Sequence, residues 1–278
     1  MLRKLSITIA VALLATATAA LAEDQGQKEW RILKAAEATG LSVVNQQGED
    51  LGNVHDLVLS PAGARVTHMI ISSGGVLGFG DTLRPVPIEA ARVHRQGEDK
   101  KWIVQLDVES ARFKDAPALK KDDWTSLSQT QWSADLDTYY SVTVIERRRE
   151  DNIHKASDLI GMDIRNLRGE DAIGELAEIV FESDTGKIRY GALSFGGFLG
   201  FGETLFAVPW ESLSFTRPSG EEEVKYLTLT VEVSEEGLRE AKGFAKDNWP
   251  AKADDRFLAD REGVPRKQVA DRDEDVRR

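Results

Sequence analysis

The 278-residue sequence contains no cysteine. Disulfide bonds, thiolate metal ligands and a cysteine for lipid attachment are therefore excluded, and stability must come from packed apolar cores. Hydrophobic residues make up 41% of the chain. That content is enough for two compact domains of somewhat under about 100 residues each.

Histidines are few, and no two of them have the spacing of metal ligands such as His-x3-His. The four are His55, His68, His94 and His154. The chain also lacks a Gly-x-Ser-x-Gly nucleophile elbow, and no Gly-Lys-Ser or Gly-Lys-Thr follows its glycine-rich stretches. We therefore expect no catalytic residues, no metal and no cofactor, and we expect that the protein is not an enzyme.

Only one long hydrophobic run occurs. Arg3 and Lys4 precede the uncharged residues 5–22, which end in Ala20-Leu21-Ala22. This pattern is typical of a secretory signal peptide, here residues 1–22 with cleavage after Ala22, and it predicts a periplasmic protein. The alternative is a retained anchor helix, although the run is shorter than the roughly 20 residues that a membrane span prefers.

Basic residues are outnumbered by acidic ones, and the formal net charge is −11. Removal of residues 1–22 takes away two cations and no acid, which makes the charge −13. A negative field disfavours nucleic acid and anionic lipid as partners. We expect an unidentified protein partner instead, with membrane contact only if the N-terminal segment is retained.

A duplicated stretch organises the rest of the chain. Residues 72–89 are identical to residues 194–211 at 12 of 18 positions, and both copies contain the sequence Leu-Gly-Phe-Gly. Such a long period indicates a tandem repeat. We place the first repeat at residues 34–124 and the second at 154–250, aligned from Ala36 against Ala156 with one extra residue in the second copy. In this alignment His154 has no counterpart.

Each repeat shows short β-branched segments separated by turn residues every eight to twelve positions, which is typical of a small β-barrel. A short helical turn precedes the strands, and we expect a closing helix after them, within residues 107–124 and 232–249. Each barrel is expected to close around its own apolar interior.

The segments outside the repeats are polar. Residues 125–153 form the predicted linker, whose aromatic residues suggest that part of it docks on a barrel, with a strand over residues 142–145. Residues 251–278 contain equal numbers of acidic and basic residues. We predict a disordered charged tail there.

The stretch Ser72-Ser73-Gly74-Gly75-Val76-Leu77-Gly78-Phe79-Gly80-Asp81, followed by Val86-Pro87-Ile88-Glu89, resembles the PRC-barrel family, named for the barrel of the photosynthetic reaction centre H subunit. Its copy from Ser194 to Glu211 is closer still to the common form. The resemblance implies a mainly β fold of two tandem PRC-type barrels with short flanking helices. It also implies a docking role, because this fold serves mostly as a docking module.

The glycine-rich loops could present backbone amides to a phosphate, but Asp81 and Glu203 would repel it. We interpret the loops as tight connections whose apolar tips either plug a barrel end or contact a partner. The candidate interaction residues are Val76, Leu77, Phe79, Phe198, Leu199 and Phe201.

Three acidic positions recur in both repeats, namely Asp56 with Glu178, Asp81 with Glu203, and Glu89 with Glu211. Recurrence in both copies favours capping or turn bonding over a catalytic carboxylate pair. We therefore expect an exported, non-enzymatic interaction or scaffold module. The alternatives are a component of a photosynthetic or respiratory membrane complex related to the H subunit, and a periplasmic binder of a small ligand or cation.

Overall fold

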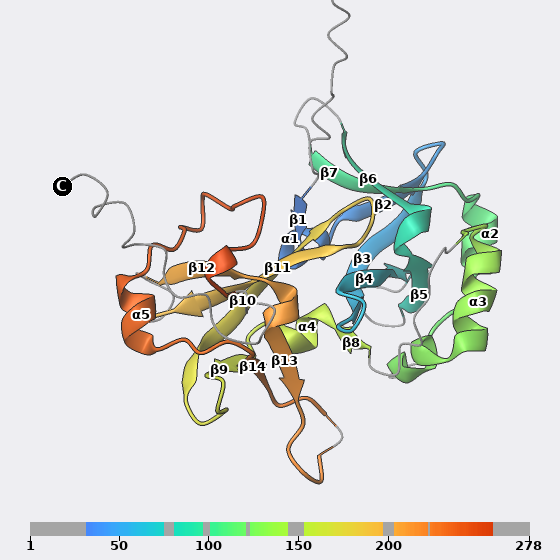
Figure 1. The fold of residues 1–278 in the computed structure, drawn as a ribbon. Coiled ribbons are helices and arrows are strands. Elements are labelled where there is room, and N and C mark those ends of the chain that lie inside the picture. Colours follow the sequence, from blue (N-terminus) through green and yellow to red (C-terminus); the bar gives the residue numbers. More distant parts are fainter. Residues whose placement is uncertain are drawn as a thin grey trace, which may run out of the picture. The chain divides into compact units, whose positions relative to one another are not determined.

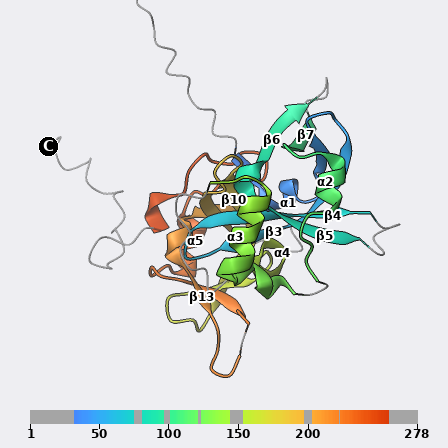
Figure 2. The same ribbon diagram turned by 90° about the vertical axis from the view of Figure 1, so that its right-hand side faces the viewer.

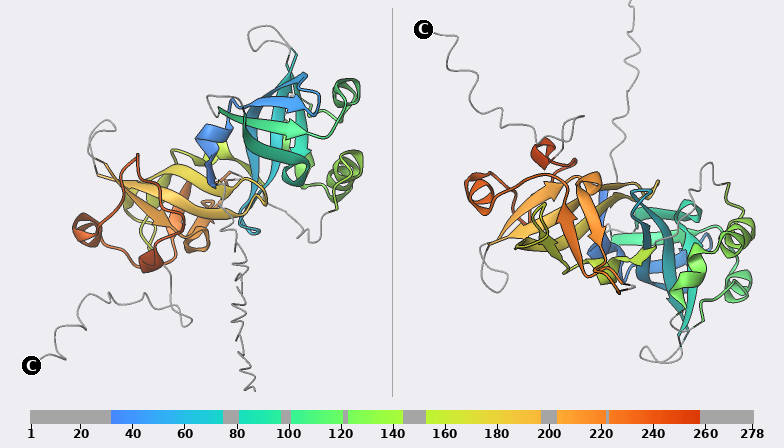
Figure 3. Two further views of the ribbon diagram at one scale, coloured as in Figure 1. Left: turned by 90° about the horizontal axis from the view of Figure 1, so that it is seen from above. Right: turned by 60° about the horizontal axis from the view of Figure 1, so that its bottom comes forward.

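The computed structural model describes residues 32–74, 81–96, 101–120, 123–143, 153–196, 203–221 and 223–257 (Figure 1). Over these residues the strands form two seven-stranded sheets with the same topology. Figure 3 shows the strands of each sheet curling around an interior. The predicted mainly β fold with two barrel repeats is confirmed.

The sheet of the first repeat has the strand order β5-β4-β3-β2-β7-β6. All neighbours are antiparallel except β2 and β7, which are parallel. The strands are β2 (Ser42–Asn45), β3 (Asp50–Ser60), β4 (Arg65–Ser73), β5 (Thr82–Pro87), β6 (Ala91–Gln96) and β7 (Lys101–Leu106), with a 3-10 turn η1 (Ile88–Ala90) between β5 and β6.

The second repeat copies this order as β12-β11-β10-β9-β14-β13, with β9 and β14 parallel. Its long strand β10 has the same length as β3, 11 residues. The elements are β9 (Asp163–Arg165), β10 (Ala172–Glu182), β11 (Ile188–Phe195), β12 (Thr204–Val208), η3 (Trp210–Ser212), β13 (Leu213–Thr216) and β14 (Tyr226–Leu229).

The seventh strand of each sheet comes from the other repeat. Strand β1 (Ile32–Lys34), which precedes the first barrel, pairs antiparallel with β10 of the second. Strand β8 (His154–Lys155), which precedes the second barrel, pairs antiparallel with β3 of the first. The repeats therefore exchange their leading strands reciprocally.

A four-residue helix follows each exchanged strand, α1 (Ala35–Ala38) after β1 and α4 (Ala156–Leu159) after β8. These helices show that Ala35 matches Ala156 and that Gly40 matches Gly161. The extra residue placed in the second copy is therefore wrong for this segment, and His154 matches Leu33.

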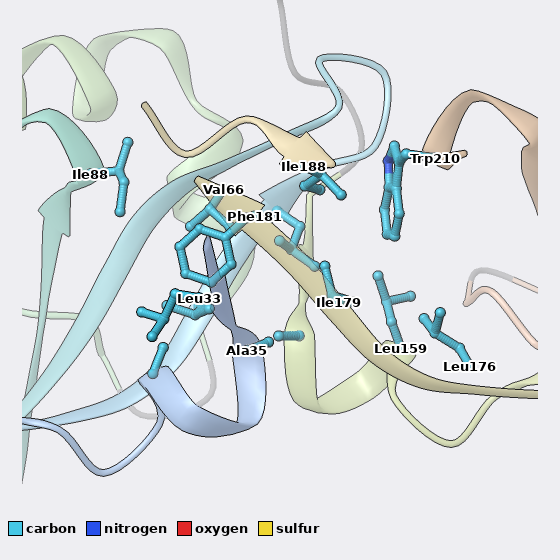
Figure 4. Close-up of a cluster of buried hydrophobic side chains, with 14 of the residues drawn as sticks. Leu33, Ala35, Val66, Ile88, Leu159, Leu176, Ile179, Phe181, Ile188 and Trp210 are labelled. Carbon is cyan, nitrogen blue, oxygen red and sulfur yellow. The ribbon is translucent and has the colours of Figure 1, made fainter. Parts of the chain in front are cut away.

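One apolar core runs through both repeats. It includes Leu33 and Val66 from one part of the chain and Phe181 and Ile188 from the other, all nearly inaccessible to solvent. Figure 4 shows Leu33 beside Phe181, with Val66 close by. The expectation that each barrel closes around its own interior is wrong, because the exchanged strands carry apolar side chains into the other repeat. We call the boundary where β1 pairs with β10 and β8 pairs with β3 the seam.

The expected closing helices are shorter than predicted. The first is α2 (Ser110–Lys114) and the second is α5 (Glu235–Glu240). Pro117 and Gly243 follow them, and neither residue favours continued helix. The chain then returns to the barrel in both repeats, since Leu119 N–H donates to Leu83 O at 2.8 Å and Phe244 N–H donates to Leu205 O at 2.8 Å.

The linker is largely packed on the first barrel. It contains η2 (Trp124–Ser128) and the helix α3 (Thr130–Tyr139), which faces the viewer in Figure 2. Leu127 and Leu136 are buried against Val58 and Ile70. Docking is thus confirmed, but the helix was not predicted. Val142 and Thr143 are not in a strand, and residues 144 and 145 lie outside the described residues.

The packed region continues past residue 250. Phe257, in η4 (Asp255–Phe257), is buried 6.0 Å from the Phe206 ring, and its carbonyl accepts a hydrogen bond from Ser212 Oγ at 2.6 Å. The tail prediction is therefore wrong for residues 251–257, because an aromatic anchor fixes them. Residues 258–278 and the signal segment 1–22 lie outside the described residues. No helix within the described ranges is long and apolar enough to span a membrane.

Candidate functional site

The six candidate interaction residues lie in segments 75–80 and 197–202, outside the described residues. The structure describes the bases of both loops. Ser72 Oγ donates to Asp81 Oδ2 at 2.6 Å, and Ser194 Oγ donates to Glu203 in the same way. A serine and an acid thus join the two ends of each glycine-rich loop, which confirms the turn-bonding role expected for this acidic pair.

The loop base of the second repeat carries an additional cation. Lys246 forms an ion pair with Glu203, and its contact together with the Ser194 hydroxyl lowers the pKa of that carboxyl. The carboxylate is therefore held ionised by its neighbours. A charged acid at this point is a poor neighbour for a phosphate, which supports the interpretation of the loop as a connection.

A second acidic pair, Asp56 and Glu178, lies at the seam, and a β-bulge next to each residue sets the direction of its side chain. The register of β3 and β4 shifts between Val54 and Asp56, and that of β10 and β11 shifts between Leu176 and Glu178. A bulge adds one residue and redirects the side chain after it. Both acids consequently point away from solvent, with exposures of 5% for Asp56 and 6% for Glu178.

Each of these buried acids caps the helix of the other repeat. Asp56 accepts from Ser157 Oγ at 2.6 Å and from Ser157 N–H at 3.3 Å, at the start of α4. Glu178 Oε1 accepts from Ala36 N–H at 3.2 Å, at the start of α1. Free N–H groups at a helix start need such acceptors. The capping role that recurrence suggested is confirmed, and it crosses between the repeats.

The titration of Glu178 follows its burial. Loss of solvent raises the pKa of this carboxyl, while the N–H groups of Ile179 and Ala36 and the charge of Lys34 act in the opposite direction. The desolvation effect is the largest of these. Glu178 is thus a structural acid whose ionised form is costly.

A lysine next to each exchanged helix makes a further contact between the two repeats. Lys34 lies 4.9 Å from the Trp249 ring centroid, and Lys155 lies 5.3 Å from that of Trp124. Each lysine lies at the start of one repeat and covers the last tryptophan of the other. The aromatic residues Trp124, Trp132, Tyr140 and Trp249 pack at the edges of buried clusters, and those of the linker dock on the barrel as predicted.

The histidines are dispersed. His55 stacks on Trp124 with ring centroids 6.4 Å apart, His68 is buried beside Thr67, and His154 stacks on Phe215 at 5.7 Å. Within the described ranges no group of three or more histidine, aspartate or glutamate side chains is placed to hold a metal ion.

Two open grooves are present on the described surface. One of about 490 Å³ is lined by the acids Glu170, Asp171, Glu232 and Glu235, and by Ser234. The other, of about 600 Å³, lies beside Arg92, Arg112, Tyr139 and Tyr140. Arg112 and Tyr139 satisfy each other there, because each donates to the backbone carbonyl of the other. Neither groove contains a nucleophile and base in contact.

Comparison with known families gives one result that matches this geometry. The PRC-barrel domain matches twice, at residues 32–110 and 151–231, and together the two matches span more than half of the chain. This chain belongs to the PRC-barrel family. No curated protein matches it. Each match includes its exchanged strand, so the leading segment is part of the PRC-barrel domain and not a separate extension.

Sequence reasoning identified the matched acids of this PRC-barrel protein but missed what they bind. The helix-start residues Ala36 and Ser157 lie more than 100 residues from the acids that cap them. Lys34 is similarly distant from Trp249, whereas Lys155 lies only 31 residues from Trp124. The repeated Lys-Ala dipeptides at 34–35 and 155–156 are the sequence signal that could have corrected the alignment of the two repeats.

Proposed function

We propose that this PRC-barrel protein is an exported, non-enzymatic interaction module that acts as a scaffold in the periplasm or envelope. The observation that carries the proposal is the use made of the matched acids. Asp56 and Glu178 cap helices, and Asp81 and Glu203 close loop bases. Two of the three recurring acidic pairs are thus committed to the fold, which favours an interaction role over a duplicated active site.

A further duplicated feature is the pair of glycine-rich loops with apolar residues at their centres. Each loop is held at its base by a serine and an acid on neighbouring strands. A clamped base limits the conformations that the loop must lose on binding, which favours a contact surface. Apolar tips on such loops are the part of the chain best suited to a protein partner.

The test is crosslinked capture of partners from intact cells, using the full chain and its variants Phe79→Asp and Phe201→Asp. Loss of a specific partner in these variants, with unfolding midpoints unchanged, is the expected result. Leu167→Asp is the matched control, because Leu167 is a large apolar residue that is 47% exposed and belongs to the turn between β9 and β10. Retention of every partner by both phenylalanine variants, or turnover of a hydrolase substrate by the pure protein, would refute the proposal.

Export is tested separately by sequencing the N-terminus of the protein recovered from cells. We expect a start at Glu23. A chain that still begins before residue 5 would instead favour the anchored, H-subunit-like alternative.

A further inference from the structure

The segments that contain the two exchanged strands, Ile32-Leu33-Lys34 and Ile153-His154-Lys155, differ only at the middle residue. In β1 the middle residue is Leu33, which is 1% exposed and faces Phe181 in the register. At the matching position β8 carries His154, which faces Leu59. The flanking pattern is otherwise shared, since both segments continue with Lys-Ala, a small residue and an acid.

His154 is half-buried at the position that the apolar side chain of Leu33 fills in the other copy. Its ring lies almost parallel to the Phe215 ring, at 12° and 5.7 Å between centroids. Its Nε2 atom is buried and has no hydrogen-bond partner within the described structure. A neutral imidazole can tolerate this site, whereas an imidazolium would bury a second N–H donor and a charge.

We propose that His154 makes the attachment of β8 and α4 to the first barrel sensitive to acid, so that this half of the seam loosens when the ring is protonated. The β1 half, with leucine at the same position, stays closed. The exchange thus contains one acid-responsive contact and one unresponsive copy of it in the same molecule.

Burial of the His154 ring and the net effect of the charges around it favour its neutral form. Burial lowers the pKa of His154, and the positive charge of Arg217, which follows β13, acts the same way. Asp158, in α4, opposes them and is already paired with Lys155 at 2.9 Å. From β3 and β13 the residues that the structure places against the ring are the apolar Leu59 and Phe215.

The direction of the pH dependence of β8 and α4 attachment follows from the lowered pKa of His154. Above pH of about 6.5 the ring is neutral in both the attached and the detached segment, so pH has no effect there. Below that value the detached segment binds a proton first, and attachment weakens until the pKa of the attached state is passed. The response is therefore confined to mildly acidic pH, which a histidine is suited to sense.

Hydrogen exchange of the full chain at pH 7.5 and pH 5.0, corrected for the intrinsic rate, tests the proposal. We expect the protection factors of the amides of residues 154–160 to be about tenfold lower at pH 5.0 than at pH 7.5, while those of residues 33–39 stay unchanged. His154→Leu, which restores the residue of the other copy, should abolish the loss. Leu33→His should transfer an acid response to residues 33–39.

Equal loss of protection in both segments, or an unchanged response in His154→Leu, would overturn the proposal. A second measurement does not require either variant to fold. The pKa of His154 in the unaltered protein, followed by NMR of its ring protons, should lie below 6.5. A value at or above 6.5 would equally overturn it.

Discussion

Arg65 and Lys187 form an antiparallel bridge pair across the seam, and each is the counterpart of the other in the two repeats. The flanking hydrogen bonds run from Val66 N–H to Gly186 O at 2.7 Å and from Ile188 N–H to Ala64 O at 2.8 Å. A residue that meets its own counterpart marks a local two-fold relationship, as at an isologous dimer interface. The tandem chain is therefore organised like a dimer of PRC-barrels joined into one polypeptide.

The hairpin tip at Gly186 should not accept a side chain. Its φ is +71°, and an added Cβ would lie 2.3 Å from Val66 O and 3.1 Å from Ile88. We expect Gly186→Val to lower the free energy of unfolding by about 2–4 kcal/mol in urea titrations. Ala64→Gly, at the matching position with φ of 49°, is the control and should change it by less than about 1 kcal/mol. Equal effects of the two substitutions would contradict the close approach at this bridge.

Leu33→Ala should destabilise the second barrel although the residue precedes the first. Leu33 is buried against Phe181 of β10, and removal of such a side chain costs about 2–4 kcal/mol. We expect the amides of β10 and β11 to lose protection from hydrogen exchange. Val93→Ala, in β6 of the first repeat, is the control and should act on its partner strand β7 instead. Loss confined to β2–β7 in the Leu33→Ala protein would argue against the exchange.

Glu178 and His154 should give the seam opposite responses to acid. The pKa of Glu178 is raised by burial, so the folded protein binds a proton before the unfolded chain does. This contribution to stability is full below the ordinary value of 4.5 and is lost as pH rises through the raised value. Glu178→Gln should remove it. Thermal unfolding of both proteins between pH 4.5 and 7.5 checks this, and a difference in midpoint that is constant with pH would count against a buried, titrating Glu178.

Deletion of residues 251–278 should lower the unfolding midpoint, whereas deletion of residues 258–278 should not. The longer deletion removes Phe257 from Phe206 and leaves Ser212 Oγ without its acceptor. Loss of a buried phenylalanine costs about 3–5 kcal/mol. Differential scanning calorimetry of the two truncated proteins distinguishes them, and identical midpoints would mean that Phe257 adds no stability.

Much of the fold could be predicted from the sequence because its signals are local. The repeat from Ser72 to Glu89, the turn residues between strands and the recurrence of Asp56 and Glu178 each required only a short window of sequence. The exchange could not be predicted this way. A strand such as Ile32–Lys34 buries the same side chains whether it pairs with β3 or with β10, and alternation does not specify the partner.

The helices illustrate the same limit. Equal segment lengths suggested long closing helices, yet α2 and α5 end early because Pro117 and Gly243 redirect the chain. The turn η2 and the helix α3 were missed because their apolar residues, Leu127 and Leu136, are sparse in a polar segment. Their partners, Val58 and Ile70, come from an outer barrel face that the sequence alone does not identify.

The most direct test of the two-fold seam is a disulfide between Arg65→Cys and Lys187→Cys. The pair lies between flanking hydrogen bonds that face away from it, a geometry in which Cα atoms are about 4.5 Å apart and a disulfide can close. The chain has no other cysteine, so the crosslink is unambiguous. We predict that the double variant oxidises within a single chain, giving a monomer by light scattering with increased mobility on non-reducing gels. A protein that stays reduced under mild oxidant, or that links only between chains, would contradict the seam described here.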